Sequence, residues 1–205
     1  MNTALLVVDT QNDFCPGGAL AVPEGDEVVS VINNLTEEFE SIVFTQDWHP
    51  AGHHSFASSH DGKEPFDEIT MDYGPQVLWP DHCIQGTTGA EFHPDLNVNP
   101  AQLVIRKGFR KNIDSYSGFF ENDHLTGTGL AGYLKERNIK TLYIAGLAAD
   151  FCVKWTVLDA RKLGFQVHVV TDAVRGLDVN GSLDQAWRKM SESGAQFTDS
   201  GKLLK

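Results

Sequence analysis

Cys152 is the residue of this sequence whose position best suits nucleophilic chemistry. It follows the short apolar run Thr141–Gly146 and lies at the start of a helical pattern, so we expect it at a helix amino terminus. Unpaired N–H groups and the helix dipole at such a terminus stabilise a thiolate, which predicts a lowered thiol pKa. The same N–H groups can hold the oxyanion that forms when a thiolate attacks a carbonyl group. A lone cysteine is more often an inert core residue, and we interpret Cys15 and Cys83 in that way.

Two charged residues end other apolar runs and are the natural partners of a reactive thiol. Asp9 ends the run at 3–9, and Lys107 ends the run at 103–107. In an open parallel sheet the carboxyl ends of the strands meet at one edge, where ligands bind. An aspartate in an apolar environment can serve as the base for a thiol, and a neighbouring lysine keeps the carboxylate charged and positioned. Taken singly, each could instead be a strand-end residue in a salt bridge. With Cys152 they predict a set of nucleophile, base and orienting cation.

A metal site is indicated by Asp47 and His49, which are separated by one residue, and by the more distant His82. One carboxylate and two imidazoles, with water in the remaining positions, suit Zn²⁺, Fe²⁺ or Mn²⁺. The Asp-x-His spacing alone is a weak signal, because the pair occurs in many loops. His53 and His54 could supply another ligand, but we expect both to be solvated loop residues.

The elements that must position these residues alternate along the chain. We predict strands at Thr3–Asp9, Ser41–Asp47, Leu103–Lys107, Thr141–Gly146 and Gln166–Asp172, with a weaker sixth at Ala195–Thr198. We predict helices at Glu24–Glu40, Gly129–Arg137, Asp150–Leu163 and Ser182–Ser193. The strands are apolar on both faces, as in a parallel sheet covered on two sides. The alternation predicts an α/β fold, a three-layer α/β/α sandwich with a mostly parallel central sheet.

The segment 48–100 breaks this alternation and contains most of the histidines. A loop of that length without secondary structure is uncommon unless it serves a function. No repeat, low-complexity tract or linker divides the chain. We therefore expect one domain over residues 1–205, with a metal-site insertion at about 48–100.

The amino-acid composition limits the classes of molecule that we expect this protein to bind. Lys and Arg total 16 against 28 Asp and Glu, which gives a net charge of −12. An acidic surface repels phosphate backbones and anionic lipid, so we expect neither nucleic acid nor membrane as a partner. No run approaches the ~20 apolar residues of a membrane span. Three cysteines without a CxxC pair, and an amino terminus without signal-peptide features, predict a cytoplasmic protein. The sequence leaves open whether the chain forms a homo-oligomer.

Read together, these residues resemble the nicotinamidase/pyrazinamidase branch of the isochorismatase-like cysteine hydrolases. The resemblance runs from about Leu5 to Asp172, in the order of the family. It rests on VVDTQNDFCPGGAL at 7–20, TQDWHPAGHHSF at 45–56, WPDHC at 79–83, RKGFRKNIDSYSGF at 106–119 and GLAADFCV at 146–153. Five such segments in order form a far more specific signal than any one of them.

The resemblance implies a role for each group of site residues. It implies a catalytic triad of Asp9, Lys107 and Cys152, metal ligands Asp47, His49 and His82, backbone oxyanion donors at Ala148 and Cys152, and substrate-binding pocket walls at Phe14, Leu20, Trp79 and Tyr116. It also implies a cis peptide between Leu147 and Ala148. One divalent ion is expected, Zn²⁺ before Fe²⁺ or Mn²⁺. A further ligand is left open among His54, Ser55 and water alone.

The implied reaction is the hydrolysis of nicotinamide to nicotinate and ammonia through a thioester, as a step of NAD salvage. Pyrazinamide-type analogues are expected as further substrates. The alternative is a sister cysteine hydrolase that acts on a carbamoyl or ureido amide. Such an enzyme would keep the aspartate, lysine and cysteine but would have no reason to keep the metal segment. An inactive, metal-stabilised binding module is the third hypothesis.

Overall fold

A six-stranded parallel sheet forms the centre of the protein in the computed structural model, which describes residues 2–204. Its strands are β1 (Thr3–Val8), β2 (Ile42–Asp47), β5 (Leu103–Lys107), β6 (Thr141–Gly146), β7 (Gln166–Val174) and β8 (Gln196–Thr198). They lie in the order β5-β2-β1-β6-β7-β8, and every neighbouring pair is parallel. The predicted fold class and all six predicted strands are confirmed, with shifts of one or two residues at some ends.

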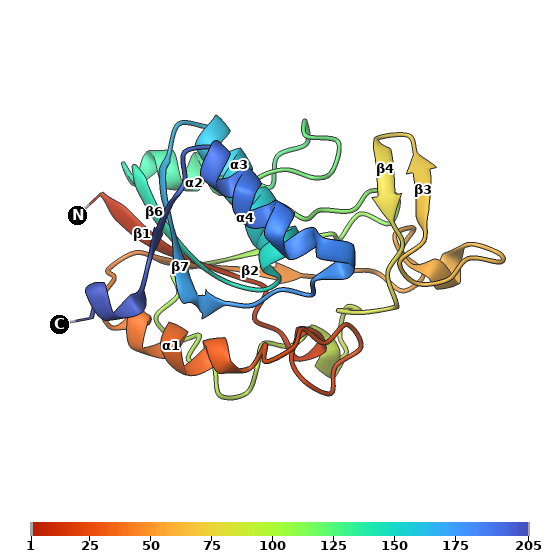
Figure 1. Ribbon diagram of the computed structural model, residues 1–205, viewed down its shortest axis with the longest axis horizontal. Coiled ribbons are helices and arrows are strands. Elements are labelled where there is room, and N and C mark those ends of the chain that lie inside the picture. The colour runs from red at the N-terminus through yellow and green to blue at the C-terminus, as the bar shows by residue number, and fades with distance from the viewer. Residues whose placement is uncertain (1, 205) are drawn as a thin grey trace.

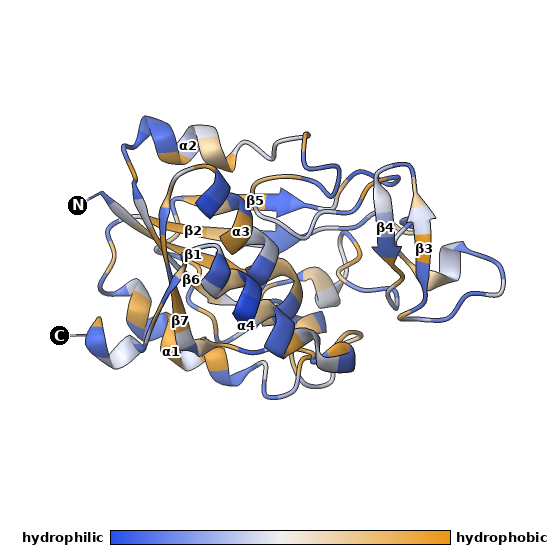
Figure 2. Cartoon of the chain, turned by 45° about the horizontal axis from the view of Figure 1, so that its top comes forward, coloured by the Kyte–Doolittle hydropathy of each residue, from blue (hydrophilic) through white to orange (hydrophobic). Residues whose placement is uncertain are grey.

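Helices cover both faces of this sheet (Figure 1). Helix α1 (Glu27–Thr36) packs on one face, and α2 (Leu130–Glu136), α3 (Lys154–Lys162) and α4 (Ser182–Glu192) pack on the other. Figure 2 shows the central strands as the most hydrophobic part of the chain. Alternate residues of β1 enter opposite cores: Leu5 and Val7 pack with α1, and Leu6 and Val8 pack with the other three helices. A strand buried on both faces carries apolar residues at every position, which is why these runs were recognisable.

The helix expected at Asp150–Leu163 is organised differently at its start. A wide turn, Ala149–Val153, precedes α3, and the Val153 N–H donates to the Ala148 carbonyl five residues earlier. Such π-type turns are rare and often occur at functional sites. The expected helix at Glu24–Glu40 is also shorter at both ends, since only 27–36 is helical. Short 3₁₀ turns occur at Asn12–Phe14, Ala57–Ser59, Thr88–Ala90, Val179–Gly181 and Ser200–Lys202.

The segment 48–100 contains a small hairpin that the sequence reading did not predict. Strands β3 (Glu68–Met71) and β4 (Gly74–Val77) pair antiparallel and form a sheet of their own. Both views show this hairpin projecting from one end of the sandwich, away from both termini (Figures 1 and 2). Two of the four β3 residues are exposed, so the strand lacks the apolar run that marks a core strand. Within residues 2–204, no helix is long and apolar enough to cross a membrane.

Gly146, the last residue of β6, lies so close to the backbone of β1 that no side chain fits there. Its φ is +110°, and a Cβ there would lie 2.0 Å from the Val8 carbonyl oxygen. We expect Gly146→Ala to lower the free energy of unfolding by about 3 kcal/mol or more, through strain and a backbone clash. Gly132→Ala is the matched control, because a Cβ at Gly132 in α2 meets nothing within 4 Å. It should change stability by no more than about 1 kcal/mol, in the stabilising direction. Urea titration of both variants measures this, and equal stabilities would contradict the packing described.

Candidate active site

The predicted catalytic residues converge at the carboxyl edge of the sheet. Asp47 and Lys107 end β2 and β5 and lie directly opposite each other in the parallel register. Asp9 follows β1, and Cys152 lies in the wide turn after β6. All four side chains are buried. The topology therefore brings together groups that lie 38 to 143 residues apart in the sequence, counted from Asp9 to Asp47 and from Asp9 to Cys152.

Lys107 is the centre of this cluster. Its ammonium nitrogen Nζ lies 2.8 Å from Asp9 Oδ2 and 3.0 Å from Asp47 Oδ1. It also donates to the Ser115 carbonyl oxygen at 2.9 Å and to Cys152 Sγ at 3.4 Å. Burial disfavours the charged form, but Asp47 and Asp9 together hold the pKa of Lys107 well above its usual value. A fully buried lysine of this kind stays protonated and fixes the two carboxylates and the thiol around one point.

The two carboxylates that share Lys107 differ in proton affinity. Burial raises the pKa of Asp9, although Lys107 opposes the shift. Burial acts on Asp47 as well, yet His49 and Lys107 hold the pKa of Asp47 well below its usual value. Neighbouring carboxylates whose pKa values are moved apart are suited to different tasks. Asp9 is the group suited to take and return a proton, and Asp47 is suited to remain an anion and bind a cation.

Asp9 is held in place by β2 as well as by Lys107. The Thr45 hydroxyl donates to Asp9 Oδ1 at 2.6 Å, and the Asp9 N–H donates to the same hydroxyl at 3.2 Å. Asp9 adopts a φ of +43°, which is uncommon for a residue other than glycine. The carboxylate therefore has one oxygen bonded to Thr45 and the other directed at the ammonium of Lys107.

Burial raises the pKa of the Cys152 thiol well above its usual value, although Lys107 acts in the opposite direction and Asp9 adds to the rise. The lowered pKa that we expected from a helix terminus is therefore wrong for this site. The reason is that the thiol is enclosed and faces two carboxylates. The peptide between Leu147 and Ala148 is cis, as the resemblance implied. A thiol that holds its proton this firmly requires an adjacent base.

Asp47, His49 and His82 form a cluster whose candidate ligand atoms all lie within 4.8 Å of one another. Asp47 Oδ2 is 3.0 Å from His49 Nε2 and 3.4 Å from His82 Nε2. In both imidazoles, Nδ1 is hydrogen-bonded to a backbone carbonyl oxygen, at 2.9 Å for His49 and 2.8 Å for His82. A backbone acceptor on one ring nitrogen turns the other toward a metal and fixes its tautomer. The predicted residues thus form a buried site with the donor set and orientation of a metal centre.

His53 is fully buried, so the expectation that it is a solvated loop residue is wrong. Its ring lies 4.4 Å from that of His49, and its Nε2 lies 2.8 Å from the Arg110 carbonyl oxygen. Its Nδ1 lies 2.7 Å from the Ser55 hydroxyl. The segment 49–56 folds back so that His53 packs against His49, and Phe56 packs against both His49 and His82. The Gly- and Pro-containing sequence did not reveal this. His54 is half-buried, and no ligand role is evident for it.

A pocket opens onto both halves of the site. Its lining includes all four predicted wall residues together with Asp47, His82, Ala148 and Cys152. Sequence reasoning missed three further lining residues, which are Asp114, Phe151 and Leu177. Phe151 adjoins Cys152 in the sequence, and Asp114 lies in the segment after Lys107, so the sequence offered a signal for both. Leu177 follows β7 and carried none.

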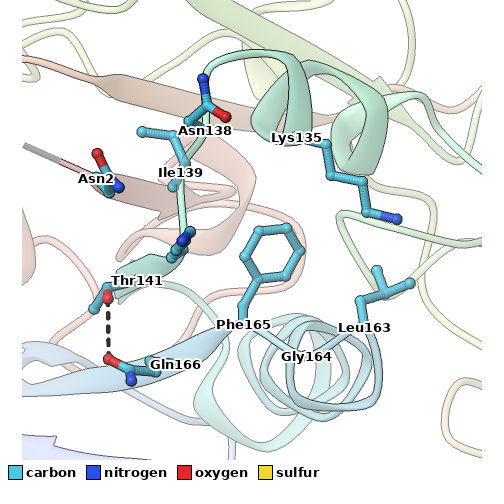
Figure 3. A pocket seen from close by; sticks show the side chains of 10 residues that line it. Asn2, Lys135, Asn138, Ile139, Thr141, Leu163, Gly164, Phe165 and Gln166 are labelled. Atoms are coloured by element: carbon cyan, nitrogen blue, oxygen red, sulfur yellow. Dashed lines mark hydrogen bonds between the residues drawn. The ribbon is translucent and has the colours of Figure 1, made fainter.

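A larger hollow lies at the opposite end of the sheet (Figure 3). It is lined near the amino ends of β6 and β7 by residues such as Lys135, Thr141, Phe165 and Gln166. None of its lining residues is a cysteine, histidine, aspartate or glutamate. The predicted reactive residues line instead the smaller pocket at the carboxyl edge.

Comparisons with known proteins show the family of this chain. The model of the isochorismatase domain family matches residues 3–202. The nicotinamidase of Acinetobacter baylyi is 58% identical over 203 residues, which cover 99% of this chain and 95% of that protein. The structure of a nicotinamidase/pyrazinamidase from Acinetobacter baumanii is 60% identical, covers 99% of this chain and 98% of that one, and superposes with a TM-score of 0.98. The chain therefore belongs to the isochorismatase family, in its nicotinamidase branch.

Two other similar structures contain bound groups. The pyrazinamidase of Pyrococcus horikoshii, in complex with zinc, is 37% identical, with a TM-score of 0.79 and coverage of 97% of this chain and 99% of that one. A protein from L. infantum, in complex with nicotinate, is 35% identical, with a TM-score of 0.84 and coverage of 97% and 93%. Relatives of this chain therefore bind zinc and a pyridine carboxylate.

Lys107 provides a direct test of the buried cluster. We expect Lys107→Met to lower the free energy of unfolding by about 3–5 kcal/mol, because it leaves two buried carboxylates without their cation. The exposed Lys111→Met serves as control and should change stability by less than about 0.5 kcal/mol. Denaturant titration of the two variants beside the wild type gives the comparison. A Lys107→Met variant as stable as wild type would show that the cluster is not held by this cation.

Proposed function

We propose that this protein hydrolyses nicotinamide to nicotinate and ammonia, with Cys152 as nucleophile, and that the reaction serves NAD salvage. The observation that carries the proposal is one pocket lined by Cys152 and by Asp47 and His82, two residues of the metal-type cluster that Asp47, His49 and His82 form. The nucleophile reaches the carboxamide, and the cluster faces the ring of the same substrate. A carbamoyl or ureido amide has no ring nitrogen and would leave the cluster without a function.

In the first stage, Asp9 accepts the proton of the Cys152 thiol, and the thiolate attacks the amide carbon. The raised pKa of Asp9 supports this role, because a base works best when its pKa is close to the working pH. The negative charge that develops on the carbonyl oxygen is stabilised by the backbone N–H groups of Ala148 and Cys152. Lys107 stays protonated throughout and holds Asp9 in position.

In the second stage, protonated Asp9 delivers its proton to the amide nitrogen as the C–N bond breaks. Ammonia leaves, and the acyl group remains on Cys152 as a thioester. Asp9 then accepts a proton from water, whose oxygen attacks the thioester carbon. The C–S bond breaks, the proton on Asp9 returns to the sulfur, and the acid product leaves as nicotinate, its remaining proton passing to the released ammonia. Each proton taken by Asp9 is given back, so the cycle closes.

Asp47, His49 and His82 are the residues that would hold one divalent ion, with zinc as our first choice. When bound, the ion supplies a Lewis acid for the ring nitrogen of the substrate, directly or through water. One carboxylate and two imidazoles in a buried site fit zinc, and the zinc-containing structure from Pyrococcus horikoshii supports that choice. Water is the further ligand that we propose, because no ligand role is evident for His54 and the Ser55 hydroxyl faces His53.

The pocket walls suit a flat heteroaromatic ring. Trp79 meets Phe151 edge to face at a ring distance of 4.7 Å, and Tyr116 lies 6.1 Å from Trp79. Phe14 and Leu20 line the pocket with them. Aromatic walls hold a planar ring well and exclude water from the reacting bond. Pyrazinamide has the same shape and a nitrogen in the equivalent position, so we propose it as a second substrate.

Cys152→Ala should abolish ammonia release from nicotinamide and leave the fold intact, because the sulfur is removed and nothing else is disturbed. Cys15→Ala, a change of the same type outside the pocket, should keep nearly full activity. Ammonia release with each purified variant, together with circular dichroism, measures both effects. Substantial turnover by Cys152→Ala would contradict the assignment of Cys152 as the nucleophile.

Removal of the divalent ion by a chelator should abolish turnover of nicotinamide, and a divalent ion should restore it. Metal analysis should find about one equivalent per chain in the wild type and much less in His82→Ala, which lacks one of three protein ligands. Benzamide has no ring nitrogen and should be cleaved far more slowly than nicotinamide. An apoprotein that binds nicotinamide with undiminished affinity would refute the role of the ion.

A further inference from the structure

Gln76 lies on the projecting hairpin and yet is among its most buried residues. Its side chain is 1% exposed, whereas the neighbouring Pro75 is exposed and Val77 is only half-buried. The hairpin shares no strand pairing with the main sheet. A buried polar side chain at such a position needs hydrogen-bond partners, and Gln76 finds them both on the hairpin and in the segment after Lys107.

The amide of Gln76 is surrounded by partners from two parts of the chain. Its nitrogen Nε2 lies 3.1 Å from Asp114 Oδ2, 2.9 Å from the Tyr116 hydroxyl and 2.7 Å from the Val77 carbonyl oxygen. Its oxygen Oε1 accepts from the Tyr73 hydroxyl at 3.0 Å. Asp114 and Tyr116 both line the substrate pocket, but Gln76 does not.

The orientation of this amide is fixed by Asn122. The Tyr116 N–H donates to Asn122 Oδ1 at 3.0 Å, so the Nδ2 of Asn122 must face the other way. That nitrogen donates to Gln76 Oε1 at 3.1 Å. Gln76 Nε2 is then directed at Asp114 and Tyr116, which can only accept in this geometry. A flipped amide would set two donors against each other at Asn122 and two acceptors against each other at Asp114.

The Tyr116 hydroxyl is held from a second side by the pocket wall itself. Trp79 Nε1, which can only donate, points at this hydroxyl from 3.1 Å. Trp79 lies three residues after Gln76 on the chain that leaves β4. The side chain of Gln76 and the indole of Trp79 thus set the position of the same phenol from opposite ends of one segment.

From this geometry, and resting on the proposed function, we infer that Gln76 is a positioning residue for substrate binding. Its amide joins the hairpin to the segment 114–122 and sets the spacing of the Trp79 and Tyr116 walls. It also fixes the Asp114 carboxylate beside the metal-type cluster, where Asp114 Oδ1 is 3.9 Å from His49 Nε2. Gln76 acts only through these groups and touches neither Asp9 nor Cys152. Its loss should therefore weaken the binding of the ring more than the chemical step.

Gln76→Met keeps the length of the side chain and removes the amide. With nicotinamide, we expect KM to rise by about 10- to 100-fold, the effect of leaving buried polar partners unsatisfied, while kcat changes by less than about threefold. Gln76→Glu should raise KM further, because it sets a second carboxylate against Asp114. Thr70→Ala, on the exposed side of the same hairpin, should leave both constants unchanged.

A double-mutant cycle separates positioning from a general structural effect. Gln76→Met and Tyr116→Phe should be strongly non-additive in KM, because both remove one shared interaction. Gln76→Met and Leu20→Ala should be nearly additive, because Leu20 lines the pocket but has no part in the hydrogen bonds of Gln76. If Gln76→Met fails to fold, as judged by circular dichroism, Gln76→Glu takes its place in both cycles.

Two failures are distinguishable. A wild-type protein that does not turn over nicotinamide would defeat the proposed function and this inference with it. Normal wild-type turnover with an unshifted KM in the folded Gln76 variant would overturn the role of Gln76 alone. So would a variant in which kcat falls and KM does not, or additivity with Tyr116→Phe. A raised KM with non-additivity supports the inference.

Discussion

The structure depends on a single buried cation. Lys107 is fully buried between Asp9 and Asp47, and without it two carboxylates would stand unpaired in a low-dielectric interior. The same ammonium links the two halves of the site, because it contacts both Asp9, which lies beside the Cys152 thiol, and Asp47, which is part of the metal-type cluster. Together, the two carboxylates and the Lys107 ammonium still carry one more negative than positive charge. That excess favours a cation beside Asp47, and so the charge balance and the ligand geometry point to the same place.

The parallel sheet explains how such a cluster can be assembled at all. Each strand ends at the same edge, so a residue at the end of a strand is brought near its counterparts whatever its distance in the sequence. Lys107 and Asp47 are register partners on adjacent strands, which fixes their separation through backbone hydrogen bonds. The Cys152 thiol lies in the wide turn after β6, where the backbone departs from a regular α-helix. The sheet therefore positions the charged groups, and a local irregularity positions the thiol of Cys152.

The sheet edge and the local turn differ in how much of the site could be predicted from the sequence. Asp9, Lys107 and Cys152 were recognisable because apolar runs end at or just before them, and a periodic pattern locates the sheet edge. The four pocket walls came from the resemblance, and all four line the pocket. His53 was misjudged because no periodicity marks the burial of a loop residue. The pKa of Cys152 was misjudged because a helix terminus is read from local sequence, whereas desolvation depends on what distant segments place over the sulfur. The hairpin was missed since its strands are short and partly exposed.

The independence of the hairpin has a consequence for how such a protein can change over time. Because β3 and β4 pair only with each other, residues can be inserted or removed there without shifting the register of any strand that carries Asp9, Asp47 or Lys107. Selection can thus reshape the wall of the pocket while the bond-breaking groups stay where they are. Gln76 hydrogen-bonds the hairpin to the pocket residues Asp114 and Tyr116, so a lineage that loses it gains freedom to move the aromatic wall toward another ring. Diversification of substrate range and conservation of the reaction become separable at the level of individual residues.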